Sequence, residues 1–271
     1  MNLVILTLNW NGKDKLIKLK DGLFNNLAIL KKEGIDSTWY IKDNGSKDGS
    51  IEEINSWNCS VKLYEIGHNR DNFAEGVNYL FDKANPDDND LVLLLNNDIT
   101  FIDDCSLKNM VDLIQKPNIG IVGARLLYTN TNKIQSGGTI FSRRYNNLPY
   151  HFRAGEESDN NAKISKYFQA VTAAVAFVKA SSFRRVGGWD CGFRWAFCDV
   201  DFCLRVGQQE KIAYCGKTNI YHDESYSLKK NSINKLNVQH NVKYFREKWN
   251  GKYDIDHDKY LENPHYNEIK D

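Results

Sequence analysis

The stretch Leu91–Asp98, with the sequence LVLLLNND, constrains the fold of this 271-residue chain more than any other. Five apolar residues run without a break, which predicts a central strand in a sheet covered on both faces. In open α/β sheets ligands bind beyond the carboxyl ends of the strands, so we expect Asn96 and Asp98 at the rim of a cleft. Two oxygen side chains at this spacing can share a hard cation such as Mn²⁺ or Mg²⁺. The alternative is that the polar residues only form a turn and cap the helix near Asp103.

Around this stretch, predicted strands alternate with predicted helices. Apolar runs predict further strands at Leu3–Leu8, Trp39–Lys42, Val61–Ile66 and Ile119–Leu127. Helical spacing and end signals predict helices at Lys13–Lys32, from Ser50 with Glu53 completing a capping box, at Asn72–Ala84 and around Asp104–Gln115. Alternation at this spacing predicts an α/β fold with a mostly parallel sheet, wound right-handed.

The second half of the chain has a less regular pattern. Its predicted elements are an extended segment Lys133–Ser142, a long surface loop Arg143–Lys166, a buried strand Phe168–Val178, a short helix Ala180–Val186, an aromatic loop Trp189–Phe197, a helix Cys198–Gln209, short strands Ile212–Tyr214 and Asn219–Tyr221, and a basic segment of near-helical spacing, Leu228–Tyr253. Loops as long as the predicted 143–166 loop are usually functional or mobile.

Bulk composition argues against several classes of protein. Lysine plus arginine number 36 and aspartate plus glutamate 35, which argues against binding of polyanions over the whole surface. The six cysteines form no CxxC pair and no zinc-site spacing, so we expect reduced thiols. No stretch approaches the roughly 20 apolar residues of a membrane span, and the chain begins with a strand pattern rather than a signal peptide. We therefore expect a cytoplasmic protein.

Polar residues follow several of the predicted strands, at positions that a sheet topology brings to one edge. They are Asp43, the Asn96/Asp98 pair, the Asp199/Asp201 pair and His222. Each also has a structural interpretation, as a turn former, a helix cap or a hydrogen-bonded histidine. Their coincidence at strand ends favours a site.

Collinear stretches over residues 3 to 225 resemble the inverting nucleotide-sugar glycosyltransferases of the GT-A fold, glycosyltransferase family 2, and most closely its rhamnosyltransferase-like members. The matching stretches are Val4–Gly12, Ile41–Ser50, Asn69–Asn78, Leu93–Thr100, Thr172–Phe197 with GGWD inside, Cys198–Arg205 and Ile220–His222. Each is weak alone, but their order makes the match specific. The resemblance implies a GT-A, Rossmann-like sheet with flanking helices over residues 1–227. We expect residues 228–271 to form a C-terminal helical extension packed on the same domain.

The resemblance also implies which residues bind the donor. Asp43 would accept a hydrogen bond from the nucleotide base, most naturally the N3–H of uracil or thymine, which implies a UDP or dTDP sugar. The other residues implied on the donor side are Thr7 and Asn9 at the end of the first strand, Asn69 with Phe73 and Gly76 behind it, and Asn96 and Asn97.

For the reaction itself, the resemblance implies a divalent cation, Mn²⁺ or Mg²⁺, bound directly by Asp98 and completed by His222. Asp199 matches the catalytic base that takes the proton of the acceptor hydroxyl, and a single displacement inverts the anomeric carbon. On the acceptor side we expect Trp189, Asp190, Trp195 and Asp201, the last being an acid two residues after the base.

Three positions depart from the family pattern. Asn96 stands where many members carry aspartate, so the cation is expected to be bound more weakly or through water. Cys198 replaces the glutamate that commonly precedes the base, which removes a charge beside Asp199. Glu75-Gly76 replaces a more usual glycine pair, and packing against the diphosphate is expected to differ.

Two alternatives stay open. One is a chain that binds nucleotide sugars without transferring them, in view of Asn96 and Cys198. The other concerns the acceptor, which is undetermined between a glycan, a lipid-linked sugar and a nucleic acid. Arg143–Arg153 and Leu228–Tyr253 both mix basic and aromatic residues, which suits hydroxylated bases in DNA or an anionic membrane surface. A solvated helix face packed on the core explains the basic segment equally well.

Overall fold

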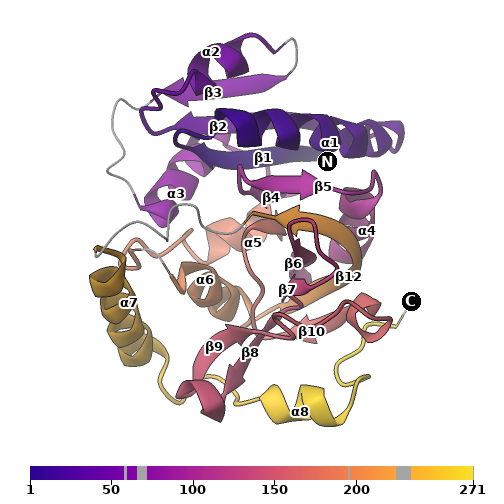
Figure 1. Ribbon diagram of the computed structural model, residues 1–271, viewed down its shortest axis with the longest axis vertical. Coiled ribbons are helices and arrows are strands. Elements are labelled where there is room, and N and C mark those ends of the chain that lie inside the picture. The colour runs from indigo at the N-terminus through magenta and orange to yellow at the C-terminus, as the bar shows by residue number, and fades with distance from the viewer. Residues whose placement is uncertain (58–59, 66–71, 195, 224–232, 271) are drawn as a thin grey trace.

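The structure is a computed structural model that describes residues 1–57, 60–65, 72–194, 196–223 and 233–270 (Figure 1). Helices pack on both faces of a mixed, mostly parallel sheet, which confirms the predicted α/β class. Within the described residues the sheet consists of β1 (Asn2–Asn9), β2 (Asp36–Asp43), β3 (Val61–Glu65), β4 (Leu91–Leu95), β5 (Ile99–Phe101), β6 (Ile119–Tyr128), β7 (Ile134–Ser136), β10 (Lys166–Phe168), β11 (Val175–Lys179) and β12 (Lys211–His222).

A separate two-stranded hairpin and the helices complete the described structure. The hairpin consists of β8 (Thr139–Ser142) and β9 (Leu148–His151). The helices are α1 (Lys13–Lys32), α2 (Ser50–Asn55), α3 (Phe73–Ala84), α4 (Ser106–Ile114), α5 (Ala180–Arg185), α6 (Cys198–Val206), α7 (Ile233–Trp249) and α8 (His257–Glu262), with short 3₁₀ turns at Arg143–Tyr145 and Asn161–Lys163.

The N-terminal half of the sheet is parallel and has the order β3-β2-β1-β4. Helices α1, α2 and α3 connect these strands in turn. The register pairs Asn9 with Asp43 at the ends of β1 and β2, and Leu6 with Leu94 in β1 and β4. The ends of β1, β2 and β4 therefore meet at one edge, as the sequence predicts.

The other half of the sheet mixes strand directions. Strand β11 lies antiparallel between β4 and β6, and β12 runs parallel to β6. The end of β12 also pairs antiparallel with β5, which sets His222 opposite Ile99. Because β5 directly follows the turn at residues 96–98, this pairing brings a histidine from late in the chain to the end of β4.

The segment predicted as one strand at Phe168–Val178 contains the last residue of β10 (Lys166–Phe168), a connection at residues 169–174 and most of β11 (Val175–Lys179). Strand β10 pairs with β12 at the edge of the sheet, whereas β11 lies in its middle. The chain must cross from one place to the other, and Gln169 at the crossing bonds to the backbone of Asp254. The mainly apolar sequence of residues 168–178 does not reveal this crossing, because the residues before and after it are both buried.

Two other predictions in this half are also wrong. The predicted loop Arg143–Lys166 contains β9, which pairs with β8 and is followed by the buried Phe152. The strands predicted at Ile212–Tyr214 and Asn219–Tyr221 form one strand, β12, with an irregular register between Cys215 and Ile220. A hairpin with β8 decides the first case and pairing with the distant β6 decides the second, so tertiary pairing overrides the local sequence preference in both.

The predicted capping box of α2 is absent, whereas α3 has one. Gly49, with φ of +83°, is the N-cap of α2, and the Ser50 hydroxyl donates to Asp48. At α3 the Asn72 side chain accepts from the Glu75 N–H, and the Glu75 carboxylate accepts from the Asn72 N–H, each at 2.9 Å. Glu75, a departure from the family pattern, thus completes a helix cap.

Each face of the sheet has its own hydrophobic cluster. Helices α1, α2 and α4 cover one cluster, and α3, α5, α6 and α7 cover the other. Phe245 and Trp249 of α7 and Tyr260 of α8 are buried in the same cluster as Leu94 and Phe202. The C-terminal helices therefore pack on the main core, although the expected boundary at 227/228 falls outside the described residues and stays a prediction.

Gly76 lies where α3 packs on β1, and a Cβ there would come within 2.8 Å of the terminal carbons of Leu8. We expect Gly76→Ala to lower the free energy of unfolding by about 1 kcal/mol, because overpacking costs more than the gain in helix propensity. Urea denaturation measures this change. Asp82→Ala, on the exposed side of the same helix, is the control and should not destabilise the protein. Equal stability of the two variants would contradict the packing argument.

Candidate active site

Three side chains predicted on the donor side form one hydrogen-bonded chain across the ends of β1, β2 and β4. Asn97 Nδ2 donates to Asn9 Oδ1 at 2.8 Å, and Asn9 Nδ2 donates to Asp43 Oδ2 at 2.7 Å. The backbone N–H and the hydroxyl of Ser46 also donate to the Asp43 carboxylate, each at 2.7 Å. Ser46 was not predicted as a site residue, although it lies within the family-like stretch that begins at Ile41.

Gly12 makes this arrangement possible. A Cβ at residue 12 would overlap Asn97 Nδ2 and Asn9 Oδ1, so a larger residue would push the two asparagines apart. The turn that ends at Gly12 is itself bonded to the turn after β2, since the Asn11 N–H donates to Ser46 Oγ at 2.7 Å. The donor-side edge is therefore a preorganised structure with a glycine at its closest approach.

Thr7 lies behind this chain of hydrogen bonds. Its side chain is buried, and its Oγ1 accepts a hydrogen bond from Trp39 Nε1 at 2.8 Å. Trp39 in turn stacks on Trp57 with ring centroids 5.4 Å apart. The Thr7 hydroxyl therefore forms its hydrogen bond inside the core, beneath the end of β1.

A second group of predicted residues meets at the end of β4. His222 Nε2 lies 3.2 Å from Asp98 Oδ1 and 3.4 Å from Asn96 Nδ2. Gln135, which was not predicted, holds the other side of the ring: its Oε1 lies 2.6 Å from His222 Nδ1, and its Nε2 donates to the His222 carbonyl at 3.1 Å. An amide oxygen can only accept, so Nδ1 carries the proton of this contact, and Nε2 is the ring nitrogen that faces Asp98.

These residues fit a divalent cation. Asp98 Oδ1 is buried and accepts no hydrogen bond, so it faces the His222 nitrogen with an uncompensated lone pair. A carboxylate oxygen and an imidazole nitrogen are both suitable ligands for Mn²⁺. Lys15 Nζ, 3.8 Å from Asp98 Oδ2, balances part of the carboxylate charge. No cluster of three or more His, Cys, Asp or Glu ligands exists among the described residues, so water or substrate would have to complete the coordination.

The predicted base, Asp199, lies in the first turn of α6. The preceding Phe197 has φ of +67°, an uncommon conformation for a non-glycine residue and one that marks a constrained turn. Asp199 Oδ1 accepts from the Val200 N–H at 2.9 Å, and the carboxylate also accepts from the Ala173 N–H. Burial raises the pKa of Asp199, and the charge of His151 with these N–H groups offsets the rise only in part. A raised pKa is suited to a general base.

Asp199 and Asn96 line one cavity of about 460 Å³. Burial, and then the charge of Asp199, raises the pKa of the Cys198 thiol, so this residue places no charge beside the base. The cavity is lined by Phe73, Asn96, Thr139, Pro149, Tyr150, His151, Thr172, Ala173, Ala174, Ala196, Phe197, Cys198, Asp199, Val200 and Val238. The structure thus brings the predicted base and the turn that carries Asp98 to a shared space.

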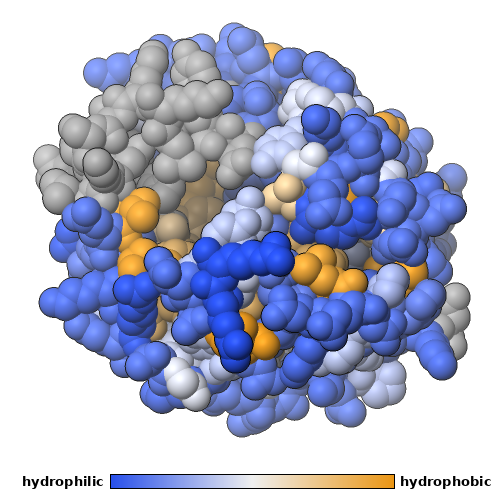
Figure 2. Space-filling model, turned by 60° about the horizontal axis from the view of Figure 1, so that its bottom comes forward, coloured by the Kyte–Doolittle hydropathy of each residue, from blue (hydrophilic) through white to orange (hydrophobic). Residues whose placement is uncertain are grey.

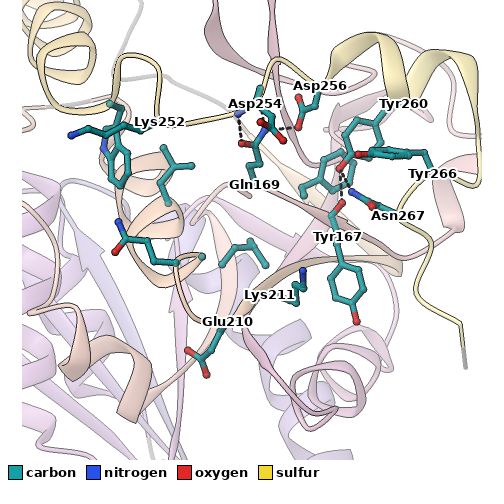
Figure 3. A pocket seen from close by; sticks show the side chains of 16 residues that line it. Tyr167, Gln169, Glu210, Lys211, Lys252, Asp254, Asp256, Tyr260, Tyr266 and Asn267 are labelled. Carbon is teal, nitrogen blue, oxygen red and sulfur yellow. Dashed lines mark hydrogen bonds between the residues drawn. The ribbon is translucent and has the colours of Figure 1, made fainter.

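A larger cavity, of about 600 Å³, lies between β10, β12, α6 and the C-terminal segment (Figure 3). It contains none of the predicted site residues. Several of its polar side chains bond within the chain, because Gln169 bonds to Asp254 and Asp256, and Tyr260 donates to the Tyr167 carbonyl. Size alone therefore does not identify the site, and the chemistry favours the smaller cavity.

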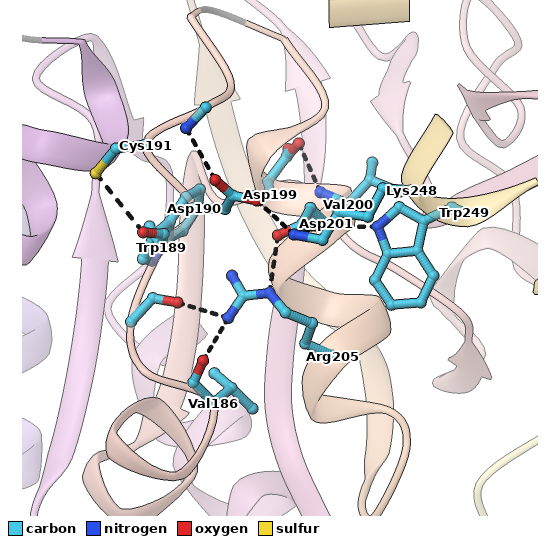
Figure 4. A network of polar contacts seen from close by, with 12 residues as sticks. Val186, Trp189, Asp190, Cys191, Asp199, Val200, Asp201, Arg205, Lys248 and Trp249 are labelled. Carbon is cyan, nitrogen blue, oxygen red and sulfur yellow. Dashed lines mark hydrogen bonds and ion pairs between the residues drawn. The ribbon is translucent and has the colours of Figure 1, made fainter. Parts of the chain in front are cut away.

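Asp201 and Asp190, both expected on the acceptor side, belong instead to a network of charges (Figure 4). The fully buried Asp201 accepts hydrogen bonds from Arg205 Nε and Trp249 Nε1, each at 2.8 Å. Lys248 Nζ lies 2.7 Å from Asp201 Oδ1 and 2.5 Å from Asp190 Oδ2. Lys248 of α7 thereby connects α6, the helix that carries Asp199, to the preceding loop that carries Asp190.

Trp189 is buried and stacks on Phe202, with ring centroids 5.1 Å apart, and it contacts the edge of Phe73. Asn78 holds its backbone through a pair of hydrogen bonds of 2.8 and 2.9 Å. The structure therefore places Trp189 in the core behind the cavity. Two further predicted site residues, Asn69 and Trp195, lie outside the described residues.

Solved structures with the same fold are glycosyltransferases. The mannosyltransferase PcManGT from Pyrobaculum calidifontis, in complex with GDP-Man and Mn²⁺, aligns with a TM-score of 0.64 and 15% identity over 96% of this chain and 69% of its own. GalNAc-T7 with UDP, GalNAc and Mn²⁺ aligns at 0.67 and 12% over 93% and 48%. TarS 1–349 of S. aureus with UDP-GlcNAc aligns at 0.63 and 11% over 98% and 73%. At these identities the likeness shows the fold alone, which is the GT-A fold.

Sequence comparison identifies the family. Residues 20–180 match the family model described as Glycosyl transferase family 2, which is more than half of the chain. The chain therefore belongs to glycosyltransferase family 2, as its motifs predict.

Two curated relatives are considerably longer than this chain. The uncharacterized protein y4gI of Sinorhizobium fredii is 29% identical over 170 residues, which are 59% of this chain and 18% of that protein. The O-antigen biosynthesis protein RfbC of Myxococcus xanthus is 27% identical over 148 residues, which are 53% of this chain and 12% of RfbC. The chain thus spans less than a fifth of the length of either relative.

The charge network of Asp201 predicts a large effect of one substitution. Lys248→Met should lower the free energy of unfolding by about 2–3 kcal/mol, because it removes a cation from a buried carboxylate that keeps only its neighbours Arg205 and Trp249. Urea denaturation measures the loss.

The matched control is Lys243→Met on the same helix. Its ion pair with Glu247, at 3.8 Å, is exposed, so the control should leave stability nearly unchanged. Equal effects of the two substitutions would contradict the role of Lys248.

Proposed function

We propose that the protein transfers a sugar from a nucleoside-diphosphate donor of UDP or dTDP type to an acceptor hydroxyl, with inversion at the anomeric carbon. The observation that carries this proposal is the cavity shared by Asp199 and Asn96, next to the buried, unsatisfied oxygen of Asp98. A base and a cation site on two sides of one space are what a single displacement requires.

On the donor side, Asp43 and Asn9 would bind the nucleotide base, with Thr7 supporting the strand end. A carboxylate has about four acceptor positions, and hydrogen bonds from Asn9 and Ser46 fill three of those of Asp43, which leaves one for a base N–H. UDP is present in the GalNAc-T7 complex and UDP-GlcNAc in the TarS complex, which supports a uracil nucleotide. The roles of Asn69, Phe73 and Gly76 near the ribose and diphosphate rest on the family resemblance.

At the end of β4, Asp98 and His222 would hold Mn²⁺ or Mg²⁺, with Asn96 contributing directly or through water. A bound divalent cation neutralises the charge that develops on the diphosphate leaving group. Gln135 fixes the His222 tautomer that offers Nε2, and Asn97 connects this turn to the base-binding edge. Mn²⁺ is present in the PcManGT and GalNAc-T7 complexes, which supports the choice of ion.

Asp199 would accept the proton of the acceptor hydroxyl as that oxygen attacks the anomeric carbon. Its two backbone N–H bonds orient the carboxylate, and its raised pKa increases its affinity for the proton. We assign Asp190 and Asp201 to positioning of this helix through Lys248, rather than to the acceptor itself. A chain that only binds nucleotide sugars has no need for a buried carboxylate in this cavity.

The basic C-terminal segment has a structural use in the part of α7 that is described. Lys248 bonds to the buried Asp201 and the half-buried Asp190, Lys243 pairs with Glu247, and Lys252 donates to the Lys248 carbonyl. Hydrophilic residues cover most of the face in Figure 2, with apolar residues in separate patches. In the described part of the chain, none of the helices is both long and apolar enough to span a bilayer. The ion pairs of Lys243 and Lys248 support the packed helix face over contact with DNA or a membrane.

Replacing the proposed base tests the mechanism. Asp199→Asn should lower the rate of transfer by about 10²–10⁴-fold, because an amide cannot accept the proton. Donor binding should persist, and the rise in melting temperature with UDP-sugars and Mn²⁺ measures it.

The pH dependence of wild-type activity provides a second test of Asp199 as the base. The base must be ionised, so activity should fall as the pH drops through the pKa of Asp199, which lies above the ordinary aspartate value of 3.8. Wild-type transfer rates in Asp199→Asn would refute the assignment.

Removing the cation tests the other half of the site. EDTA should stop transfer and added Mn²⁺ restore it. Gln135→Leu should weaken Mn²⁺ binding by about 10–100-fold, since it removes the group that orients His222. The EPR signal of free Mn²⁺ measures binding independently of activity. Gln115→Leu, at an exposed position, is the control. Full activity in EDTA, or unchanged binding in Gln135→Leu, would contradict the cation site.

A further inference from the structure

Lys15, in the first turn of α1, approaches the carboxylate that we propose as a ligand of the cation. Its Nζ lies 3.8 Å from Asp98 Oδ2, whereas Asp98 Oδ1 lies 3.2 Å from His222 Nε2. The side chains of Lys15 and Asp98 are 29% and 13% exposed, so water and salt screen their charges less than on an open surface. A cation bound at Oδ1 would therefore share Asp98 with a lysine.

The packing of α1 determines where Lys15 can reach. Leu16, the next residue, is fully buried in the same cluster as Phe101 of β5. Gly22, further along the helix, lies directly against Phe101, since a Cβ at residue 22 would come within 3.0 Å of Phe101 Cβ. Strand β5 follows the turn that carries Asp98. The helix and the turn are thus packed on one support, and the approach of Lys15 to Asp98 follows from core packing.

The charges of these groups nearly cancel. In the described part of the chain, no third acidic, cysteine or histidine side chain joins Asp98 and His222 as a ligand. Imidazole and amide groups that bind a metal are uncharged, so Asp98 supplies the negative charge of the site. Lys15 carries the opposite charge beside it. A bare divalent cation would therefore gain little from Asp98 and would be repelled by Lys15.

A diphosphate reverses this balance. Its negative charge attracts the divalent cation and the lysine alike, and lysine is a common phosphate-binding residue. The anion would thus relieve the repulsion between the cation and Lys15. Binding of the cation and binding of the nucleotide should then favour each other, and this coupling has the same size in both directions.

We propose that Lys15 binds the diphosphate of the donor beside the divalent cation, and that sharing Asp98 makes the cation and the nucleotide bind cooperatively. This inference rests on the proposed function. It differs from a purely structural role of Lys15, because an ion pair that only stabilises the fold contributes little and would not couple two ligands.

Two binding measurements on the full chain test this role, with Mn²⁺ and UDP as the probes. The EPR signal of free Mn²⁺ measures binding of the cation alone, and calorimetry measures binding of UDP in the presence of Mn²⁺. Lys15→Met should bind Mn²⁺ alone about tenfold more tightly than the wild type and UDP with Mn²⁺ about tenfold more weakly. Opposite changes in the two affinities cannot arise from a loss of folded protein, which weakens both.

Two further variants serve as controls. Lys15→Arg keeps the positive charge, so it should resemble the wild type in both measurements. Lys18→Met, at an exposed position of the same helix, should leave both affinities unchanged. Circular dichroism of each variant confirms folding.

Unchanged or weaker binding of Mn²⁺ alone to a folded Lys15→Met variant would overturn the proposal, as would unchanged binding of UDP with Mn²⁺. Failure of the proposed function appears differently. In that case neither UDP nor dTDP binds to the wild type at any concentration of Mn²⁺, no nucleotide raises its melting temperature, and the role of Lys15 is refuted with it.

Discussion

The turn Asn96-Asn97-Asp98 at the end of β4 is the constraint on which the rest of the site depends. Its three side chains serve three places: Asn97 bonds to Asn9, Asn96 lines the Asp199 cavity, and Asp98 faces His222. A shift of one residue in β4 would exchange these environments. Both faces of β4 pack into hydrophobic clusters between β1 and β11, and this burial holds the register. The apolar run thus does more than form a strand, because it sets the positions of groups that would bind base, cation and sugar.

Asp199, the proposed base, is held by a different set of interactions. Asp199 and Asp201 stand two residues apart on α6 and therefore point in different directions. One lines the cavity, and the other is buried against Lys248 and Trp249 of α7. A buried carboxylate is costly unless it is paired and hydrogen-bonded. Three groups, from Arg205, Trp249 and Lys248, meet that cost in part. Removal of α7 would leave this charge inside the core, which makes the helix part of the enzyme rather than an appendage.

The meeting of Asn9, Asp43 and Asn97 at one edge could be predicted from sequence, because each of them ends or closely follows a strand. Gln135 and His151 could not be predicted, since they come from segments without clear periodicity, on strands β7 and β9, each of which pairs with the strand before it. The expectation that Asp201 faces the acceptor overlooked the geometry of a helix, in which residues i and i+2 do not share a face. The crossing between β10 and β11, at residues 169–174, could not be predicted either, because its sequence, like that of β11, is mainly apolar.

The Asp199 cavity, which we propose for the acceptor, is lined by segments with little sequence pattern, among them the hairpin β8–β9, the start of α6 and Val238 of α7. Such segments vary most readily on a fixed scaffold, so they are where one member of a family would acquire its own acceptor. The basic residues of α7 illustrate the point. On the sequence they suggest attraction to a polyanion, yet Lys248 pairs with Asp190 and Asp201. A lysine that pairs with the buried Asp201 is not available to bind a phosphate backbone.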